Sequence, residues 1–437
     1  MAKENKGKTK GKPSAGAALR DANRFLLNTY KRPPVVFTHG KGCVVFDASG
    51  KKYLDFLGGI AVNALGHAHP RILRVIRREA GRAIHLSNLY HHAFQGPLAR
   101  KLSEWSGMDR VFFSNSGTEA IEGALKLARL AALQQASETH ASRGKAKVLA
   151  LENSFHGRTF GALAITATPK YRDPFLPLLP NAAFVRFNDA ADLDAKFDDG
   201  VLAIVVEAVQ GEGGIYPVSE AFWNRARELA TQRGALLIAD EIQCGLGRTG
   251  RYFAYQKFTA KPDIVVVAKP LAGGLPLGAI LCTEAVASAI SPGLHGTTFG
   301  GGPLACATAL EFLNTVDEAG LLENIRARGA ELREGLAALQ KKFDFIREIR
   351  GEGLMVGVEL SVEGAPFVTE ALRRGLLINC THDFTLRLLP PFIVTARQVR
   401  GFLSKFEMVL AKTPRAAREA APAEKSGESL HALTAAR

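Results

Sequence analysis

Apolar and polar positions follow two different patterns along the chain, and the change falls near residue 110. Before that point, residues 33–57 alternate short apolar runs with turns, which predicts a few strands. After it, near-continuous apolar runs alternate with amphipathic stretches such as 220–232. The apolar runs predict five buried strands, at 148–152, 203–209, 236–242, 263–268 and 277–283. Buried strands joined by helical crossovers are typical of a mainly parallel sheet covered by helices, so we expect an α/β fold.

The predicted helices each carry an apolar stripe. Near 118–134, apolar residues recur at i, i+3, i+4 and i+7, and the predicted helices at 321–342 and 396–411 repeat that spacing. The C-terminal portion therefore indicates a small α+β unit, which we expect to pack with the N-terminal strands as a second, smaller domain. The expected division is a flexible basic tail at 1–20, small-domain segments at 21–70 and 321–412, a large domain at 71–320 and a second flexible tail at 413–437.

The composition fits an ordinary soluble protein, since 47% of the 437 residues are hydrophobic and 22% are charged. No apolar run approaches the roughly 18 residues of a membrane-spanning helix, and the basic N-terminal segment lacks the apolar stretch of a secretory signal. Five scattered cysteines fit reduced thiols better than a disulfide framework. We therefore expect a cytoplasmic protein with no membrane segment.

The formal net charge of +14 raises the alternative of a nucleic-acid-binding protein. Half of this excess lies near the two ends of the chain. Residues 1–20 hold five Lys and one Arg against one Glu, and residues 412–437 hold five basic against three acidic residues. The remainder forms no dense basic stripe, which favours a solvated surface over a nucleic-acid partner.

The stretch PDIVVVAKPLAGG, residues 262–274, places a charged side chain where an apolar strand ends. Lys269 follows the β-branched run and precedes Pro270, which we expect to hold the lysine in extended geometry. A lone lysine at such a place usually extends its ammonium group into water. The alternative is a desolvated lysine whose lowered pKa lets it attack a carbonyl group.

Two further strand ends carry polar residues in the stretches IADEIQCG and FFSNSGTEA. Asp240 closes a strand apolar enough to be buried, and a buried carboxylate is costly unless it meets a cation. A salt-bridged or helix-capping aspartate is the alternative. Ser116, Gly117 and Thr118 separate a strand from a helix, which suits either a bound phosphate or an ordinary N-cap.

The stretch ENSFHGRTFGA adds Phe155, which could stack on a ring, and Arg158, which could bind a carboxylate. A phosphate cradle, a buried carboxylate, a stacking ring and a reactive lysine together indicate pyridoxal phosphate as cofactor. The histidines at 67–69 and 91–92 lack a third ligand at helical spacing, so we predict no metal site.

Several phrases, in this order along the chain, resemble those of one protein family: YLDFLGGIAVNALGHAHP, FFSNSGTEAIEGALKLAR, FHGR, QGEGG, DEIQCGLGRTG, AKPLAGGLPLGA, HGTTFGGGPLACA and LRLLPPFIVT. The chain is similar from about residue 28 to about residue 410 to the class III aminotransferases, which are fold-type I enzymes dependent on pyridoxal phosphate. This resemblance implies a large domain that binds the cofactor and a smaller α+β domain built from both ends of the chain.

The resemblance also implies roles around the cofactor ring. Lys269 would bind the cofactor covalently and then move a proton as general base and acid. Asp240 would pair with the ring nitrogen, Gln243 would reach the ring hydroxyl group, and Phe155 would stack on the ring.

For the phosphate, the resemblance implies Ser116, Gly117 and Thr118, joined by Thr298 from the partner subunit of a homodimer. Thr297 would lie beside it, near the substrate. The active sites would then lie at the subunit interface.

For the substrate, the resemblance implies that Arg158 holds the α-carboxylate. Arg387 matches a second arginine that pairs with a glutamate in this family, and that glutamate is Glu212 here. Glu212 could shield Arg387 while the amine donor binds and then yield to a dicarboxylate.

The implied reaction transfers the δ-amino group of N-acetylornithine to 2-oxoglutarate, giving N-acetylglutamate 5-semialdehyde and glutamate, within arginine biosynthesis. A related ω-amine is the first alternative: ornithine, 4-aminobutyrate, succinylornithine or a lysine derivative. A pyridoxal-phosphate aminomutase, which needs no external oxo acid, is the second. A non-catalytic nucleic-acid binder gives no reason for Lys269, Asp240 and Arg158 to occur together.

Overall fold

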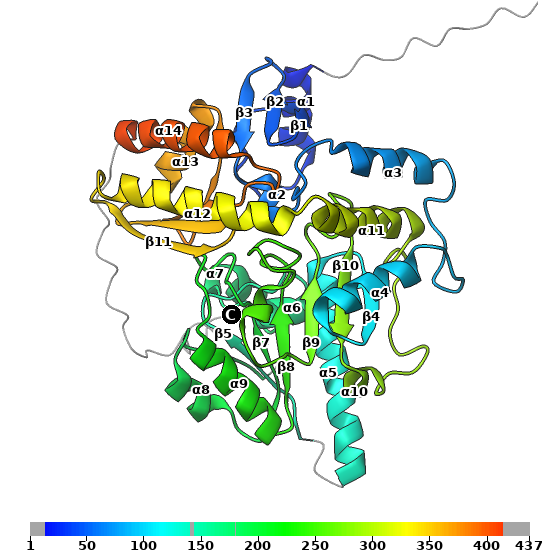
Figure 1. Cartoon of the computed structure of the whole chain (residues 1–437). Helices are drawn as coiled ribbons and strands as arrows, with labels where there is room; N and C mark the ends of the chain where they lie inside the picture. The colour runs from blue at the N-terminus through cyan, green and yellow to red at the C-terminus, as the bar shows by residue number, and fades with distance from the viewer. Residues whose placement is uncertain (1–13, 140–143, 180, 414–437) are drawn as a thin grey trace, which may run out of the picture.

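The computed structural model describes residues 14–139, 144–179 and 181–413. Its largest sheet has the strand order β4-β10-β9-β8-β7-β5-β6 (Figure 1). These strands span Arg110–Ser114 (β4), Gly278–Cys282 (β10), Ile264–Val267 (β9), Leu236–Asp240 (β8), Val201–Val206 (β7), Lys147–Leu151 (β5) and Ala182–Val185 (β6). Within this sheet β10 runs antiparallel to both of its neighbours, while the other six strands run in one direction. The prediction of a mainly parallel sheet is confirmed.

Alternate side chains of this sheet enter two separate hydrophobic cores. Helix α5 (Gly117–Thr139) packs over one core, to which Val266 of β9 belongs. Helix α9 (Glu220–Gln232) packs over the other, to which the adjacent Val265 belongs. Neighbouring residues of a strand point to opposite faces, so the two cores lie on opposite faces of the sheet. A strand covered on both faces must be apolar at every position, which explains the continuous apolar runs in the sequence.

Two four-stranded sheets form the smaller part of the molecule, in the upper half of Figure 1. The first has the order β1 (Phe37–Lys41), β2 (Val44–Asp47), β3 (Lys52–Asp55) and β13 (Leu376–Leu377). The second has the order β11 (Ile346–Glu352), β12 (Met355–Leu360), β15 (Thr385–Leu388) and β14 (Asn379–Thr381). Because β13 pairs in parallel with β3, the N-terminal and C-terminal segments share a sheet, as expected from the sequence. The domain boundaries at 70 and 320 stay a prediction.

The remaining helices pack around these sheets. They are α2 (Gly58–Ala61), α3 (Pro70–Ala80), α4 (Gln95–Ser106), α6 (Phe160–Ala164), α7 (Pro169–Arg172), α8 (Ala190–Lys196), α10 (Glu284–Ala287), α11 (Pro303–Glu318), α12 (Leu321–Gln340), α13 (Ala365–Arg373) and α14 (Ala396–Lys412), with short 3₁₀ turns at Asp173–Phe175 and Ala254–Lys257. Helix α11 contacts α3 and α4, and α12 lies on α14 and β11. Within the described ranges, no helix combines the length and hydropathy that crossing a membrane would require.

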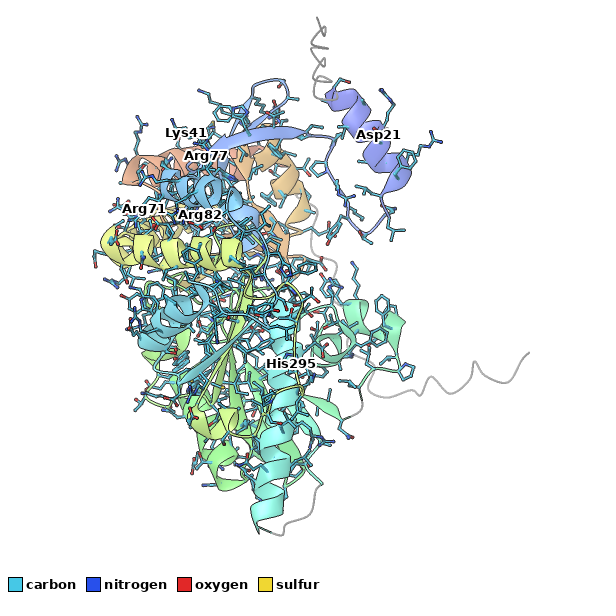
Figure 2. All side chains as sticks on the ribbon, turned by 90° about the vertical axis from the view of Figure 1, so that its right-hand side faces the viewer. Asp21, Lys41, Arg71, Arg77, Arg82 and His295 are labelled. Carbon is cyan, nitrogen blue, oxygen red and sulfur yellow. The ribbon has the colours of Figure 1, made fainter. Side chains whose placement is uncertain are left out.

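Helix α1 (Ala15–Phe25) corrects the prediction of a flexible tail that extends to residue 20. Ser14 caps this helix by accepting a hydrogen bond from the backbone N–H of Ala17 at 3.2 Å, and the alanine-rich segment that follows favours helix. None of the residues of α1 is buried, and Figure 2 shows Asp21 of this helix at the periphery of the molecule. The rest of the two predicted tails, at 1–13 and 414–437, lies outside the described residues.

Candidate active site

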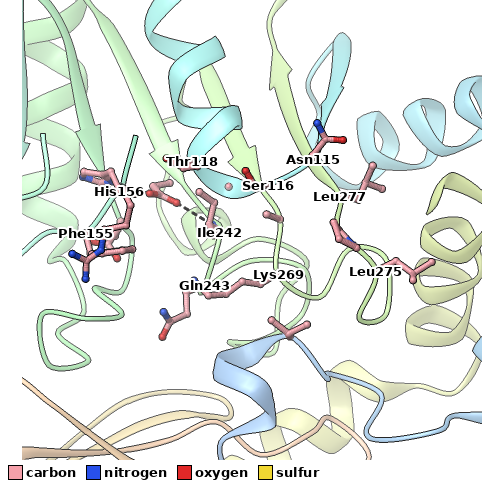
Figure 3. Close-up of a pocket in the computed structure, with 18 of the residues that line it drawn as sticks. Asn115, Ser116, Thr118, Phe155, His156, Ile242, Gln243, Lys269, Leu275 and Leu277 are labelled. Carbon is pink, nitrogen blue, oxygen red and sulfur yellow. Dashed lines mark hydrogen bonds and ion pairs between the residues drawn. The ribbon is translucent and has the colours of Figure 1, made fainter. Parts of the chain in front are cut away.

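A cavity of about 390 Å³ lies at the carboxyl ends of strands β4, β5, β7, β8 and β9, where ligands of open α/β sheets bind. Figure 3 shows Phe155 and His156 on one side of it, Leu275 and Leu277 on the other, and Lys269 between them. Eight of the residues singled out in the sequence line this cavity: Ser116, Gly117, Thr118, Phe155, Arg158, Asp240, Gln243 and Lys269. Four others, at 212, 297, 298 and 387, lie outside its lining.

Lys269 does not have the extended backbone that its place before Pro270 predicts. Strand β9 ends two residues earlier, and the backbone φ of Lys269 is +23°, a value that is uncommon and strained for a residue with a side chain. The N–H of Leu271 donates to the carbonyl of Ala268 at 2.8 Å, which closes a turn centred on Lys269 and Pro270. The tight turn thus overrides the usual preference of a residue before proline.

The environment of Lys269 favours a reactive amine. Burial lowers the pKa of Lys269, and the negative charges of Glu212 and Asp240 only partly oppose this effect. A lowered pKa increases the fraction of neutral amine, which is the nucleophilic form. The snorkelling alternative is therefore disfavoured at this position.

Asp240, the last residue of β8, forms a buried pair with His156. Nδ1 of His156 lies 2.7 Å from Oδ2 of Asp240, and the two side chains are 0% and 3% exposed. Burial alone would lower the pKa of His156, but Asp240 raises it overall and so favours the imidazolium form. Oδ1 of Asp240 accepts the N–H of Ile242 at 3.0 Å. A carboxylate oxygen can accept two hydrogen bonds, so Asp240 can still accept one more from a ligand.

His156 stands in a stretch that the sequence highlighted, but its pairing with Asp240 could not be seen there. Glu207, which follows β7, is a second residue that sequence reasoning missed. Its oxygens accept the N–H of Phe155 at 3.2 Å and of Gly211 at 3.0 Å, and burial raises the pKa of Glu207 to about 7. A carboxylate at the end of an apolar run identified Asp240 in the sequence, and the same signal could have identified Glu207.

Ser116, Gly117 and Thr118 form the turn into α5 at the edge of the cavity. Ser116 Oγ accepts the N–H of Glu119 at 3.4 Å, so it also acts as an N-cap. A Cβ at Gly117 would lie 2.8 Å from the side chain of Ile242, which would have to shift to accept it. A helix N-terminus with its backbone N–H groups at a cavity is suited to an anion such as phosphate.

Arg158 is exposed and stacks on aromatic rings at the edge of the cavity. Its guanidinium carbon lies 3.7 Å from the ring centre of Tyr171 and 5.4 Å from that of Phe155. The two rings meet edge to face, with centroids 6.2 Å apart. Stacking on Tyr171 holds a flexible arginine in place and leaves its N–H edges free to bind a carboxylate.

Glu212 and Arg387 form a second ion pair beside the cavity. Nη1 of Arg387 lies 2.6 Å from Oε1 of Glu212, and the side chains are 0% and 25% exposed, respectively. The same nitrogen donates to Gln243 Oε1 at 3.0 Å, which connects the pair to the cavity wall. Burial opposes the charge of Glu212, but Arg387 outweighs it and lowers the pKa of the carboxyl group. Nη2 of Arg387 is buried and has no hydrogen-bond partner among the described residues, although a guanidinium can donate five hydrogen bonds.

Thr297 and Thr298 are not brought into the cavity of their own chain. Thr297 Oγ1 accepts from Asn115 Nδ2 at 3.1 Å and from the N–H of Gly300 at 3.2 Å. Thr298 is exposed, and its neighbour Phe299 is 66% exposed. Neither threonine lines the cavity that the described residues of one chain form, although Asn115, the partner of Thr297, does.

Comparisons with known proteins identify one enzyme family. A family model for class III aminotransferases matches residues 26–410. The acetylornithine aminotransferases of Methanocaldococcus jannaschii and Caldanaerobacter subterraneus are 44% and 45% identical to this chain, each over 89% of it and over 96% and 98% of their own lengths. Among solved structures, the ornithine aminotransferase of Toxoplasma gondii superimposes with a TM-score of 0.87 at 33% identity, covering 92% of this chain and 96% of its own. The acetylornithine aminotransferase of Elizabethkingia anophelis gives a TM-score of 0.80 at 30% identity, over 92% and 100%.

Proposed function

Since this chain belongs to the class III aminotransferases, we propose that it transfers the δ-amino group of N-acetylornithine to 2-oxoglutarate with pyridoxal phosphate as cofactor. The products are N-acetylglutamate 5-semialdehyde and glutamate, which places the reaction in arginine biosynthesis. The observation that carries this choice of substrate is identity of 41–45% to acetylornithine aminotransferases over almost their whole lengths.

The residues around the cavity fit this cofactor. Helix α5 begins at Gly117 in the cavity wall, where its backbone N–H groups could bind a phosphate group. Asp240 has a free acceptor position that would suit a protonated ring nitrogen, and Gln243, which also lines the cavity, would reach the ring hydroxyl group. Phe155 offers a stacking ring, and Lys269 Nζ offers an amine that can bind the aldehyde carbon of the cofactor.

When bound, pyridoxal phosphate supplies an electron sink for the bonds at the amine-bearing carbon. The chain itself supplies the proton transfers. Because burial lowers the pKa of Lys269, Nζ can accept a proton from that carbon and return it. The imidazolium of His156 orients the Asp240 carboxylate, which would then hold a proton at the ring nitrogen.

Arg158 and Arg387 divide the work of binding carboxylates in this proposal. Arg158, held on Tyr171, would take the α-carboxylate of the amine donor and, in 2-oxoglutarate, the carboxylate that lies far from the reacting carbon. Arg387 would take the second carboxylate of 2-oxoglutarate once Glu212 moves away, and the 25% exposure of the Glu212 side chain supports this movement. While the amine donor is bound, Glu212 would neutralise Arg387.

We also propose that a second copy of the chain completes the site with Thr297 and Thr298. Exposed apolar side chains near these threonines support an interface there, among them Leu89, Tyr90 and Phe299. Mixing the Lys269→Ala and Thr298→Ala variants, each impaired alone, tests this arrangement. If Thr298 serves the partner's site, mixed dimers contain one intact site and regain activity. If Thr298 serves its own chain, the mixture stays inactive.

The related activity on ornithine is the second candidate, because the ornithine aminotransferase of Toxoplasma gondii superimposes so well on this chain. A half-reaction screen decides between them. The purified enzyme with bound cofactor is mixed with N-acetylornithine, ornithine or 4-aminobutyrate without oxo acid, and the absorbance of the lysine-bound cofactor is followed. We expect N-acetylornithine to react fastest and turnover to require 2-oxoglutarate. Faster reaction with ornithine would overturn the proposed donor, and turnover without an oxo acid would indicate a mutase.

A further inference from the structure

The loop at 210–217, which carries Glu212, belongs to the large domain by sequence but lies on a sheet of the small domain. It follows β7 of the seven-stranded sheet, yet its backbone carbonyl groups are held by side chains of β11, β14 and β15. Arg350 Nε donates to the carbonyl of Gly214 at 2.8 Å, and Arg387 Nη1 donates to that of Gly211 at 3.1 Å. Thr381 Oγ1 donates to the carbonyl of Glu212 itself. The backbone on both sides of Glu212 is therefore attached to the small domain.

Arg350 is the centre of this attachment. Its side chain is 5% exposed, and its guanidinium carbon stacks 3.6 Å from the ring centre of Tyr216. Nη1 forms ion pairs with Glu348, at 2.9 Å, and with Glu359, while Nη2 donates to Thr385 Oγ1 at 3.1 Å. The hydroxyl group of Tyr216 donates to the same Glu359 carboxylate at 2.7 Å. Arg350 thus binds the loop through a backbone carbonyl and an aromatic ring at once.

Two glycines of β11 and β12 allow the loop to approach this closely. A Cβ at Gly351 would lie 3.1 Å from Cγ2 of Ile215, and a Cβ at Gly357 would lie 3.0 Å from Cβ of Ile215. Ile215 is fully buried in the main hydrophobic core. The loop therefore packs directly on the sheet surface, with no room for a side chain between them.

The loop is also strained. Ile215 has a backbone φ of +62°, and a left-handed conformation is a genuine outlier for a β-branched residue. Such strain persists only where surrounding contacts determine the conformation. The contacts of Arg350 to Gly214 and Tyr216 bracket Ile215 on both sides. The strained residue stands three positions after Glu212, so its relaxation would move that carboxylate.

We propose that Arg350 is a positioning residue for the Glu212–Arg387 pair: it holds the strained loop on the small-domain sheet, so that Glu212 leaves Arg387 by side-chain rotation alone. This inference rests on the proposed function, in which Glu212 shields Arg387 during the amine half-reaction. Without Arg350 the loop relaxes and Glu212 no longer meets Arg387 reliably. The amine half-reaction then suffers, while the oxo-acid half-reaction, in which Glu212 stands aside, does not.

A double-mutant cycle on the enzyme with bound cofactor tests this inference, because residues that act through one another give non-additive effects. Glu212→Ala and Arg350→Met should each slow the amine half-reaction about tenfold and the oxo-acid half-reaction less than about twofold. The double variant should be no slower than Glu212→Ala alone. If the rate of the amine half-reaction in the double variant falls by the product of the two single effects, the proposed role of Arg350 is wrong. Equal effects of Glu212→Ala on the two halves would instead overturn the shielding role of Glu212 in the proposed function.

Glutarate provides a readout that does not depend on turnover. This dicarboxylate competes with Glu212 for Arg387, so loosening Glu212 should tighten glutarate binding several-fold in Arg350→Met, as measured by calorimetry. Unchanged or weaker binding of glutarate by a folded Arg350→Met enzyme would contradict the proposal. If Arg350→Met does not fold, Tyr216→Phe can be used in its place, because it removes only the hydrogen bond to Glu359. This variant should also slow the amine half-reaction and tighten glutarate binding, each by a smaller amount. No shift in Tyr216→Phe would then count against the proposal.

Arg248→Met is the matched control. Arg248 is also buried, and it also binds carbonyl groups of the small-domain segment, those of Leu354 at 3.1 Å and Pro390 at 2.6 Å. It has no hydrogen bond to the 210–217 loop among the bonds of the described residues. Its replacement should lower Tm but leave the ratio of the two half-reaction rates unchanged. A changed ratio in Arg248→Met would mean that any loosening of the small domain, and not Arg350 in particular, disturbs Glu212.

Discussion

Two buried ion pairs act on Lys269, and they differ in how they are built. Asp240 and His156 both come from the large domain, lie 2.7 Å apart and are almost fully sealed from solvent. Glu212 and Arg387 lie 2.6 Å apart, but they come from different domains, and the Glu212 side chain is 25% exposed. A pair sealed from solvent cannot exchange its partner for water, whereas a pair with one exposed member can open toward water. The first pair is therefore suited to hold one charge throughout the reaction, and the second to change partners during it.

Replacing Asp240 gives the largest expected effect, because it breaks the sealed pair. Removing one partner of a buried ion pair costs about 3–5 kcal/mol, which corresponds to about 10²–10⁴-fold in rate if it is expressed in the transition state. We expect Asp240→Asn to lower the rates of the amine and oxo-acid half-reactions equally and to this extent. Stopped-flow measurement of both halves checks it, and a loss confined to one half would contradict a fixed role for Asp240.

Glu241, the residue after Asp240, shows what a buried carboxylate does without an ion pair. None of the groups that shift the pKa of Glu241 is a cation. It accepts the N–H groups of Ala254 at 2.8 Å and Tyr255 at 2.7 Å, and burial raises its pKa from 4.5 to about 7. Between these two values the folded state binds more protons than the unfolded state, so Glu241 makes stability fall as pH rises from about 4.5 to about 7. This change amounts to about 3 kcal/mol at about 1.4 kcal/mol per pKa unit.

Glu241→Gln should therefore remove most of that pH dependence while leaving the ratio of the half-reaction rates unchanged. Denaturant titrations of wild type and variant at pH 5 and pH 7 measure it. Parallel changes of the unfolding free energy in the two proteins would show that Glu241 is ionised when folded across this range.

Replacement of His156 tests how the sealed pair works. Leucine removes the donor to Asp240, whereas asparagine places an amide nitrogen where Nδ1 of the imidazole stood. We expect His156→Leu to lower kcat about 10–100-fold with little change in KM, since a charge-assisted hydrogen bond contributes about 1.5–3 kcal/mol. His156→Asn should recover most of this loss. An asparagine variant as slow as the leucine variant would mean that the imidazole serves packing and not Asp240.

Opening the second pair gives the smallest expected effect and the most selective one. Glu212→Ala leaves Arg387 unneutralised when the amine donor binds, so we expect the amine half-reaction to slow about tenfold, or about 1.4 kcal/mol. The half-reaction with 2-oxoglutarate should change less than about twofold, because there Arg387 binds the second carboxylate. Single-turnover rates for the two halves decide the point. Equal slowing of the two half-reactions would mean that the Glu212–Arg387 pair, like Asp240–His156, keeps its partners throughout the reaction.

Much of the fold and the cavity could be predicted because their signals are local. Strands such as β9 are apolar at every position, and the polar residues that end them, Asp240 and Lys269, stand out against those runs. Parallel strands bring their carboxyl ends to one edge, so residues far apart in sequence share a cavity once the sheet is known. The turn at Ser116–Thr118 was equally visible, since a helix N-terminus has its own composition.

What could not be predicted depends on tertiary contacts. Nothing in the sequence shows that His156 pairs with Asp240 or that Arg158 stacks on Tyr171. The contact of Arg350 with the loop of Glu212 is equally invisible, because each of these contacts joins separate elements. The extended geometry expected for Lys269 was wrong because a closed turn outweighed a local preference. The helix at Ala15–Phe25 was missed because charge composition alone suggested a tail there.

Both ion pairs matter only if Lys269, which they influence, is the residue that binds the cofactor. Borohydride reduction of the enzyme with bound pyridoxal phosphate, followed by peptide mass spectrometry, tests this claim most directly. We expect a phosphopyridoxyl group on Lys269 and on no other lysine, with none on the peptide from a Lys269→Ala enzyme. A stoichiometric modification at another lysine, or an unmodified Lys269 in an active enzyme, would contradict it.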